Sequence, residues 1–144
     1  MDAPNAGYLV WRLSMKWRAA VDRAVARYGL THAQYSLLAT LYGMGREGLT
    51  PSQRELGERA GFEPMYVSKV ARGLEQAGLL ERARHPHDPR AFGLALTEHG
   101  QEVIGRAIPI VRGLHAELTA PIGGPEGARA RELADVLRIL LKRE

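Results

Sequence analysis

Five side chains close together in the sequence combine cationic, hydroxyl, aromatic and apolar groups: Met65, Tyr66, Ser68, Lys69 and Arg72. At helical spacing they lie opposite an apolar stripe that comprises Val67, Val70, Ala71 and Leu74. Lysine and arginine donate to guanine acceptors, serine serves either partner, and methionine or tyrosine can touch a thymine methyl group. The segment therefore carries the side chains with which a helix can contact base edges in a major groove. Tyr66 has an alternative interpretation, in which it packs beneath the helix.

Two short helices joined by a glycine turn are predicted around this segment. For the first helix we expect Thr50 as the N-cap, Pro51 at the first helical position and Gln53 as the partner that closes a capping box. Gly61 should end it, because glycine adopts the left-handed conformation without a Cβ clash. The second helix is predicted over residues 64–77 and ends at Gly78. This arrangement is typical of a helix-turn-helix.

A β-hairpin is predicted after the second helix. Residues 79–84 and 92–96 have the alternation of half-buried strands, with Phe92, Leu94 and Leu96 on one side of the second strand. The turn-rich loop between them ends in Arg90, and an arginine at such a tip suits the narrow, electronegative minor groove. Asp88 can hold that guanidinium through a charge-assisted hydrogen bond. The alternative is that the pair only stiffens the hairpin.

The segment resembles the MarR (multiple antibiotic resistance regulator) family of winged helix-turn-helix transcription factors. The matching residues are Gln53, Leu56, Ala60, Gly61, Val67, Ser68, Lys69, Leu74, Glu75, Gly78, Leu79, Arg82, Asp88, Arg90, Leu96, Thr97 and Gly100. The D-x-R pattern followed by L-T-x-x-G is the more specific part of the match. The resemblance implies a bacterial or archaeal homodimer that binds double-stranded DNA at a pseudo-palindromic operator and is often released by a small ligand or an oxidant. With it we assign Arg84 and His87 to the DNA-contacting set as well.

Three residues depart from the family pattern. Pro89 lies between Asp88 and Arg90, where its fixed φ stiffens the loop. Gly73 lies within the second helix of the unit and costs about 1 kcal/mol of helix propensity. Glu63 stands at an N-cap position that serine, threonine, aspartate or asparagine would fill better.

The flanking segments are predicted to be long amphipathic helices. The fold class expected is mainly α with a small β-hairpin wing, as one domain over residues 1–144: a winged helix-turn-helix over 30–97, flanked by dimerisation helices over 7–28 and 98–142. Thr31 with Gln34 forms a capping box for a further helix, with Gly43, Gly45 and Gly48 in the loop after it, and Thr97 caps the long helix that follows. Apolar residues on two sides of 7–28 indicate contact with a partner subunit. Pairing the terminal helices with a second copy would set two recognition helices about 34 Å apart, one turn of DNA.

The family resemblance implies a ligand site that lies between the winged unit and the dimer helices. Trp11, Met15, Trp17 and Tyr42 have the character of residues that hold a small aromatic ligand. Aromatic residues at helical spacing are more often part of a core, and a regulator without a ligand is equally compatible with the sequence.

Composition excludes several other classes of function. The 144 residues contain no cysteine, which rules out disulfides, thiolate metal sites and a thiol redox switch. His85 and His87 lack a third clustered ligand, so we expect polar wing residues and no metal or cofactor. No phosphate-binding glycine loop and no hydrolase or zinc-protease motif is present, which argues against an enzyme. Without a secretion signal or a membrane-spanning run, we expect a cytoplasmic protein with no membrane partner.

Charge alone does not identify the winged unit. The chain carries a net charge of +4, but residues 46–96 hold eight Lys or Arg against seven Asp or Glu. This near-neutral balance keeps open an alternative, a winged-helix module that binds protein without specific DNA binding. The favoured hypothesis is a homodimeric, sequence-specific transcriptional regulator. Of the two signs of regulation, we favour repression over activation.

Overall fold

A computed structural model describes residues 5–85, 87 and 92–142. The described elements are α1 (Ala6–Val25), η1 (Ala26–Tyr28), α2 (His32–Arg46), α3 (Gln53–Ala60), α4 (Pro64–Gln76), β1 (Leu80–Arg84), β2 (Phe92–Leu96), α5 (Glu98–Thr119), η2 (Ala120–Ile122) and α6 (Ala128–Leu141). The two strands pair antiparallel, with Leu80 opposite Leu96 and Arg84 opposite Phe92. The chain is therefore mainly helical with one small hairpin, as the sequence predicts.

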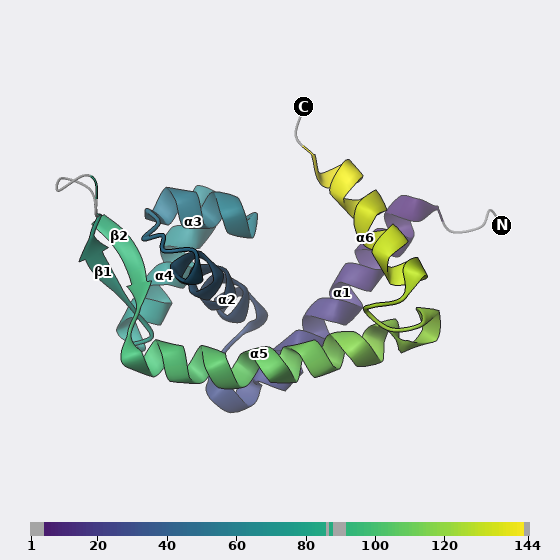
Figure 1. The fold of residues 1–144 in the computed structure, drawn as a ribbon, viewed down its shortest axis with the longest axis horizontal. Helices are drawn as coiled ribbons and strands as arrows, with labels where there is room; N and C mark the ends of the chain where they lie inside the picture. The colour runs from purple at the N-terminus through teal and green to yellow at the C-terminus, as the bar shows by residue number, and fades with distance from the viewer. Residues whose placement is uncertain (1–4, 86, 88–91, 143–144) are drawn as a thin grey trace.

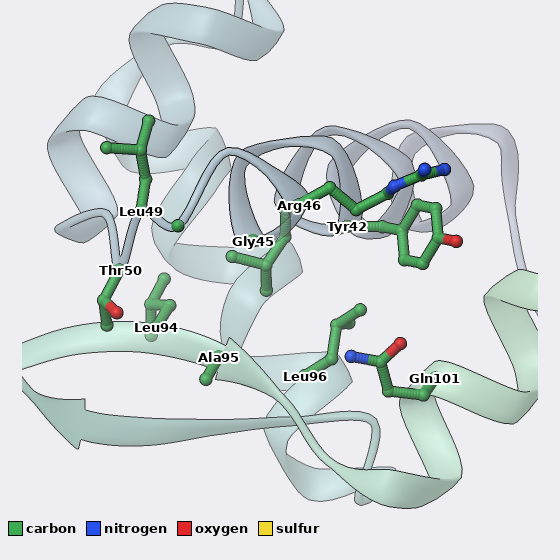
Figure 2. Close-up of a pocket in the computed structure, with 11 residues that line it drawn as sticks. Tyr42, Gly45, Arg46, Leu49, Thr50, Leu94, Ala95, Leu96 and Gln101 are labelled. Carbon is green, nitrogen blue, oxygen red and sulfur yellow. The ribbon is translucent and has the colours of Figure 1, made fainter.

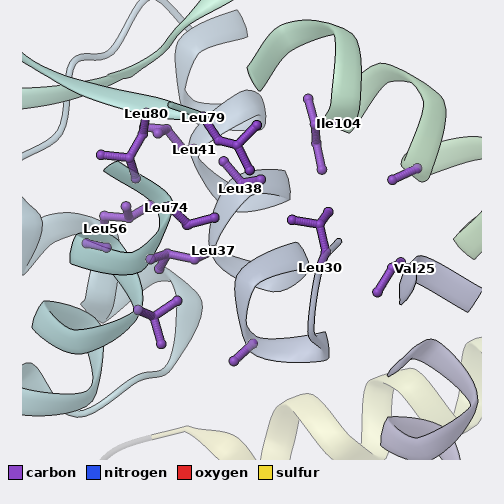
Figure 3. Close-up of a cluster of buried hydrophobic side chains, with 14 of the residues drawn as sticks. Val25, Leu30, Leu37, Leu38, Leu41, Leu56, Leu74, Leu79, Leu80 and Ile104 are labelled. Carbon is purple, nitrogen blue, oxygen red and sulfur yellow. The ribbon is translucent and has the colours of Figure 1, made fainter. Parts of the chain in front are cut away.

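The main hydrophobic core lies between α2, α3, α4 and the hairpin, and it continues to α1 and α5. Leu37 and Leu38 of α2, Leu56 of α3 and Leu74 of α4 are fully buried in it. Figure 3 shows these leucines converging, with Ile104 of α5 and Val25 of α1 extending the cluster toward the long helices. The four core-facing residues predicted for the second helix, Val67, Val70, Ala71 and Leu74, are all buried.

The long helix α5 connects two ends of the molecule. The helix-turn-helix and hairpin lie at its beginning, whereas α6 and the first turns of α1 lie above its C-terminal half (Figure 1). α5 packs against both α1 and α2. Thr97 caps it as predicted, because its hydroxyl oxygen accepts the backbone N–H of Gly100 at 2.9 Å. The Thr31–Gln34 capping box at the start of α2 is also present.

The predicted cap of α3 is wrong by two residues. Ser52, not Thr50, is the N-cap, and Glu55, not Gln53, closes the capping box. The reason is tertiary: the carbonyl of Pro51 accepts the N–H of Leu94 at 2.7 Å, so residues 50 and 51 line the edge of β2 instead of entering the helix. The two hydrogen bonds with Ser52 lower the pKa of the Glu55 carboxyl, because they favour its ionised form.

Two further predictions differ from the structure. Gly43 and Gly45 belong to α2 rather than to the loop after it, since the helix continues to bury Met44 and ends at Arg46; Gly48, with φ of 80°, makes the turn. Phe92 faces solvent and is 62% exposed, because it pairs at the hairpin's outer end, beyond the core. Within the described residues, no helix is long and apolar enough to cross a membrane.

Candidate nucleic-acid interface

The exposed face of α4 carries the five side chains singled out from the sequence. Met65 is 87% exposed, Lys69 and Arg72 also face solvent, and Ser68 is half-buried. Pro64 occupies the first turn, and Glu63 makes no side-chain hydrogen bond to the helix start. The exposed face of α4 therefore combines cationic, apolar and hydroxyl side chains.

Tyr66 packs against a neighbouring ring on one side and is open to solvent on the other. Its ring lies 5.2 Å from that of Phe62 at a tilt of 53°, which is a favourable aromatic geometry. The residue nevertheless remains 40% exposed. Phe62 thus holds one side of the Tyr66 ring and leaves the rest of the side chain accessible.

The crossing of α3 and α4 depends on a glycine that sequence reasoning did not single out. A Cβ on Gly57 would lie 2.5 Å from Cγ2 of Val67, which is closer than real side-chain contacts allow. Both residues are buried, so neither helix has free space into which to shift. The close approach positions α4 on α3. It depends on how the two helices pack, so no local sequence pattern predicts it.

The hairpin is attached to the rest of the winged unit along β2 and just after it. On β2, the Leu94 N–H donates to the Pro51 carbonyl, and a Cβ on Gly93 would lie 2.4 Å from Thr50 Cγ2. After β2, the Thr97 hydroxyl donates to the carbonyl of Gly78 at 2.5 Å. The base of the hairpin is consequently held against the segment before α3 and the segment after α4.

Gly100 explains the last part of the L-T-x-x-G pattern. A Cβ at this position would lie 1.9 Å from the carbonyl oxygen of Leu79, which itself accepts the Thr97 N–H at 3.2 Å. Any larger residue would collide with the backbone that begins β1. Thr97 and Gly100 thus fix the junction between the hairpin and α5.

An ion pair also links the hairpin to α4. Arg82 Nε on β1 lies 3.2 Å from Glu75 Oε2 on α4, and both side chains are more than 40% exposed. Solvent screens such a pair, so its contribution is small, about 0–1 kcal/mol.

The hairpin tip lies partly outside the described residues. Arg84 is exposed at the end of β1, and the exposed His87 donates its backbone N–H to Nδ1 of His85 at 3.2 Å. Asp88, Pro89 and Arg90 fall outside the described residues, so their predicted pairing remains a prediction. No group of three potential metal ligands occurs in the described part of the chain.

The four candidate ligand residues are not brought together within one chain. Trp11 and Met15 are more than half exposed on α1, whereas Trp17 is half-buried, with its ring 5.4 Å from His115 of α5. Tyr42 lines a separate cavity of about 370 Å³ between the end of α2, β2 and the first turn of α5 (Figure 2). Arg46 and Gln101 also line this cavity, and sequence reasoning had singled out neither of them.

Comparisons with known proteins agree with this geometry. A family model described as the MarR family matches residues 28–91. The uncharacterized HTH-type transcriptional regulator YdcH of Bacillus subtilis is 39% identical over 112 residues, which is 76% of each chain. The HTH-type transcriptional repressor Rv2887 of Mycobacterium tuberculosis is 30% identical over 136 residues, which is 94% of each chain.

Solved structures extend the likeness to the whole fold. The complex of Rv2887 with salicylic acid has a TM-score of 0.69 and 30% identity, covering 96% of this chain and 97% of that chain. The complex of the Mycobacterium tuberculosis regulator MosR with DNA has a TM-score of 0.73 and 28% identity, covering 95% and 96%. Sequence identity of this extent, together with the same helix order and hairpin, leaves one conclusion. The chain belongs to the MarR family of winged helix-turn-helix transcriptional regulators.

Proposed function

We propose that the protein is a homodimeric, sequence-specific DNA-binding repressor that reads a pseudo-palindromic operator in the cytoplasm. The observation that carries the proposal is the face of α4, where Ser68, Lys69 and Arg72 lie opposite four buried apolar residues. A helix with this division can enter the major groove without exposing its core. The structure of MosR in complex with DNA and the similarity to the transcriptional repressor Rv2887 support the same conclusion.

The dimer is supported by apolar surface that one chain leaves uncovered. The first turns of α1 expose Leu9, Val10 and Trp11, and α6 exposes Ile139 and Leu140, each at 48–69%. No described residue of α6 is buried. Apolar patches of this extent on a small protein mark an interaction surface. A second copy would cover both helices and supply the second recognition helix that a palindromic site requires.

Each winged unit would place α4 in the major groove and the hairpin tip in the flanking minor groove. We expect Lys69 and Arg72 to contact phosphates or guanine. From the sequence we expect Arg84, His87 and Arg90 to contact the backbone or the minor groove. A small aromatic ligand that favours another spacing of the two units would lower DNA affinity. Trp11, Met15, Trp17 and Tyr42 remain the predicted ligand residues from the sequence.

Fluorescence anisotropy with labelled DNA from upstream of the protein's own gene tests the proposal. The wild type should bind this DNA tightly and unrelated DNA weakly, and its affinity should fall as salt rises. Arg90→Ala should weaken binding at least about tenfold while the protein remains a folded dimer. Arg131→Ala is the matched control, because Arg131 is exposed on α6, away from the α4 face.

Lys69→Ala separates two kinds of contact. If Lys69 contacts a phosphate, the slope of log K against log salt concentration should become shallower by about one unit in the variant. The affinity should then fall by the same factor on all DNA sequences. A base contact predicts reduced discrimination between operator and unrelated DNA. Weak binding that is equal on both DNAs in the wild type would contradict the proposal and favour the winged-helix protein-interaction module.

A further inference from the structure

The carboxylates of the helix-turn-helix differ in whether they have a partner. Residues 53–76 contain four of them. Three are held within the winged unit by a hydrogen bond or an ion pair: Glu55 with Ser52, Glu58 with Arg54, and Glu75 with Arg82. The fourth, Glu63, is exposed, and its carboxylate makes no hydrogen bond or ion pair within the described part of the chain. Of the four, Glu63 is therefore the one left open to an external donor.

Glu63 stands where α4 begins. It is the N-cap, with an extended backbone, and Pro64 follows it in the first turn. Serine, threonine, asparagine or aspartate would supply a cap hydrogen bond at this position, which Glu63 does not. A carboxylate is favourable beside the positive end of a helix dipole, but solvent and salt screen that effect at an exposed position. Local helix stability thus gives only a weak reason for a glutamate here.

Glu63 is also the single anionic side chain on the part of α4 that we propose to enter the major groove. Lys69 and Arg72 can only donate hydrogen bonds, and the hydroxyls of Tyr66 and Ser68 can donate or accept. Lys69 and Arg72 lie six and nine residues further along, beyond the spacing of three or four at which a helix pairs opposite charges. The helix therefore brings an unneutralised carboxylate to a polyanionic surface.

Such a carboxylate distinguishes between bases. It is repelled by phosphates and by the guanine acceptors that attract lysine and arginine, so it gains only where a base presents a donor. In the major groove cytosine presents its N4 amine as a donor, whereas adenine sets the N7 acceptor beside its N6 amine. Cytosine is accordingly the base that suits a carboxylate best.

We propose that Glu63 is a specificity-determining residue that accepts a hydrogen bond from the N4 amine of a cytosine in each half of the DNA site. Opposite any other base the carboxylate stays unpaired near the phosphates, which lowers the affinity for wrong sequences. Glu63 therefore acts more by rejecting other sequences than by strengthening the correct complex. This inference rests on the proposed function and adds a base preference to it.

Selection of sites from a randomised duplex library by the wild type and by Glu63→Gln tests the base preference. The wild type should select cytosine at one position of each half-site. Glutamine can pair with the N6 and N7 atoms of adenine, so Glu63→Gln should favour adenine over cytosine there, a change in discrimination of about tenfold or more. The other positions should keep their preferences. An unchanged preference for cytosine in Glu63→Gln would overturn the proposal.

Glu98→Gln is the matched control for the loss of a charge at a helix start. Glu98 is an exposed glutamate in the first turn of another helix, α5. Glu98→Gln should leave the selected sequence unchanged. If Glu63 only stabilises the start of α4, Glu63→Gln will lower the midpoint of urea unfolding and leave the selected sequence unchanged as well. That result would also overturn the proposal.

N4-methylcytosine at the selected position tests the amine itself. This base still pairs with guanine, but its methyl group replaces the N–H that faces the major groove. In fluorescence anisotropy the wild type should bind the modified site about tenfold more weakly than the unmodified site. Glu63→Ala, which lacks the acceptor, should bind the two sites equally. Equal weakening in the wild type and in Glu63→Ala would show that the methyl group acts without Glu63 and would overturn the proposal.

The two proposals fail in different ways. A wild type that selects no sequence from the library would contradict sequence-specific DNA binding itself. A wild type that selects a site in which no position depends on Glu63 would overturn the present inference alone. Where both hold, Glu63→Ala should also bind unrelated DNA a few-fold more tightly than the wild type, because the repulsion between the carboxylate and the phosphates is removed.

Discussion

The winged unit and the terminal helices differ in how completely one chain buries them. In the winged unit, Leu37, Leu38, Leu56, Leu74 and Leu94 are at most 1% exposed. In α6 no described residue is buried, and Ile139, Leu140 and Leu141 are 69–80% exposed. Both regions are amphipathic helices, so the difference does not arise from helix propensity. It shows that the winged unit is complete within one chain, whereas the terminal helices need a second surface.

Backbone contacts sharpen this contrast. At Gly57, Gly93 and Gly100, a Cβ would approach a neighbouring atom to within 2.5 Å, and all three lie in or directly beside the winged unit. At Gly105 and Gly113 in the rest of α5, an added Cβ meets nothing within 4 Å. The three tightest glycine contacts are therefore found in or directly beside the winged unit, whereas the middle of α5 has room at both of its glycines. Substitutions should affect the two regions differently.

The largest effect is expected for Gly100→Ala. Its Cβ would overlap the Leu79 carbonyl oxygen at 1.9 Å, so α5 or the start of β1 must move, at a cost of about 3 kcal/mol or more of unfolding free energy. Urea unfolding followed by circular dichroism at fixed protein concentration measures it. Gly105→Ala on the same helix is the control and should raise stability by up to about 1 kcal/mol. Equal stabilities of the two variants would contradict the close packing of the hairpin–α5 junction.

Val136→Glu tests whether α6 forms part of a dimer interface. It should weaken the dimer and leave the fold of each chain intact. Val136 is 47% exposed on the apolar side of α6, so a carboxylate there is easily solvated in one chain and desolvated in a dimer. The dimer Kd should rise about 100-fold, with little change in helix content. Sedimentation across a concentration series measures the shift, with Arg129→Glu as an exposed control on the same helix. A dimer that is unaffected by Val136→Glu would place the interface elsewhere.

Gly73→Ala should stabilise the winged unit despite its tight packing. Gly73 lies in α4, and its added Cβ meets Nε2 of Gln34 at 3.7 Å, an ordinary contact with a flexible side chain. Replacing glycine with alanine in a helix gains about 0.5–1 kcal/mol. The same urea experiment checks this, and Gly57→Ala, which would press on Val67, is the contrasting variant. A loss of stability in Gly73→Ala would mean that α4 lies closer to α2 than described.

Sequence reasoning succeeded where the signal is local. The apolar stripe of α4, the left-handed turn at Gly61, the Thr31–Gln34 capping box and the Thr97 cap all depend on residues within a few positions of each other. It failed where contacts between segments far apart in the chain determine the local structure. The shift of the α3 cap to Ser52 follows from the bond between Pro51 and Leu94, and the joint lining of one cavity by Arg46 and Gln101 depends on how α2, β2 and α5 pack. No spacing rule relates residues so far apart in the chain.

The smallest effect is expected from pH, at the contact between α1 and α5. Half-buried His115 lies against Trp17, and burial lowers the pKa of His115 below 6.5; burial also lowers the pKa of His32, although Asp22 opposes that shift. The unfolded chain therefore binds more protons than the folded chain once the pH falls through about 6.5, so stability is full above that pH and decreases below it. His115→Gln should make this decrease shallower.

Urea unfolding at about pH 7.5 and about pH 5.5 measures that slope. His99→Gln is the control, because His99 is exposed at the start of α5 and both half-buried histidines remain in that variant. A slope that is unchanged in His115→Gln would show that protonation reaches His115 without separating it from Trp17. The α1–α5 contact would then share the openness of the terminal helices, and the boundary between the complete and the incomplete region would lie closer to the winged unit.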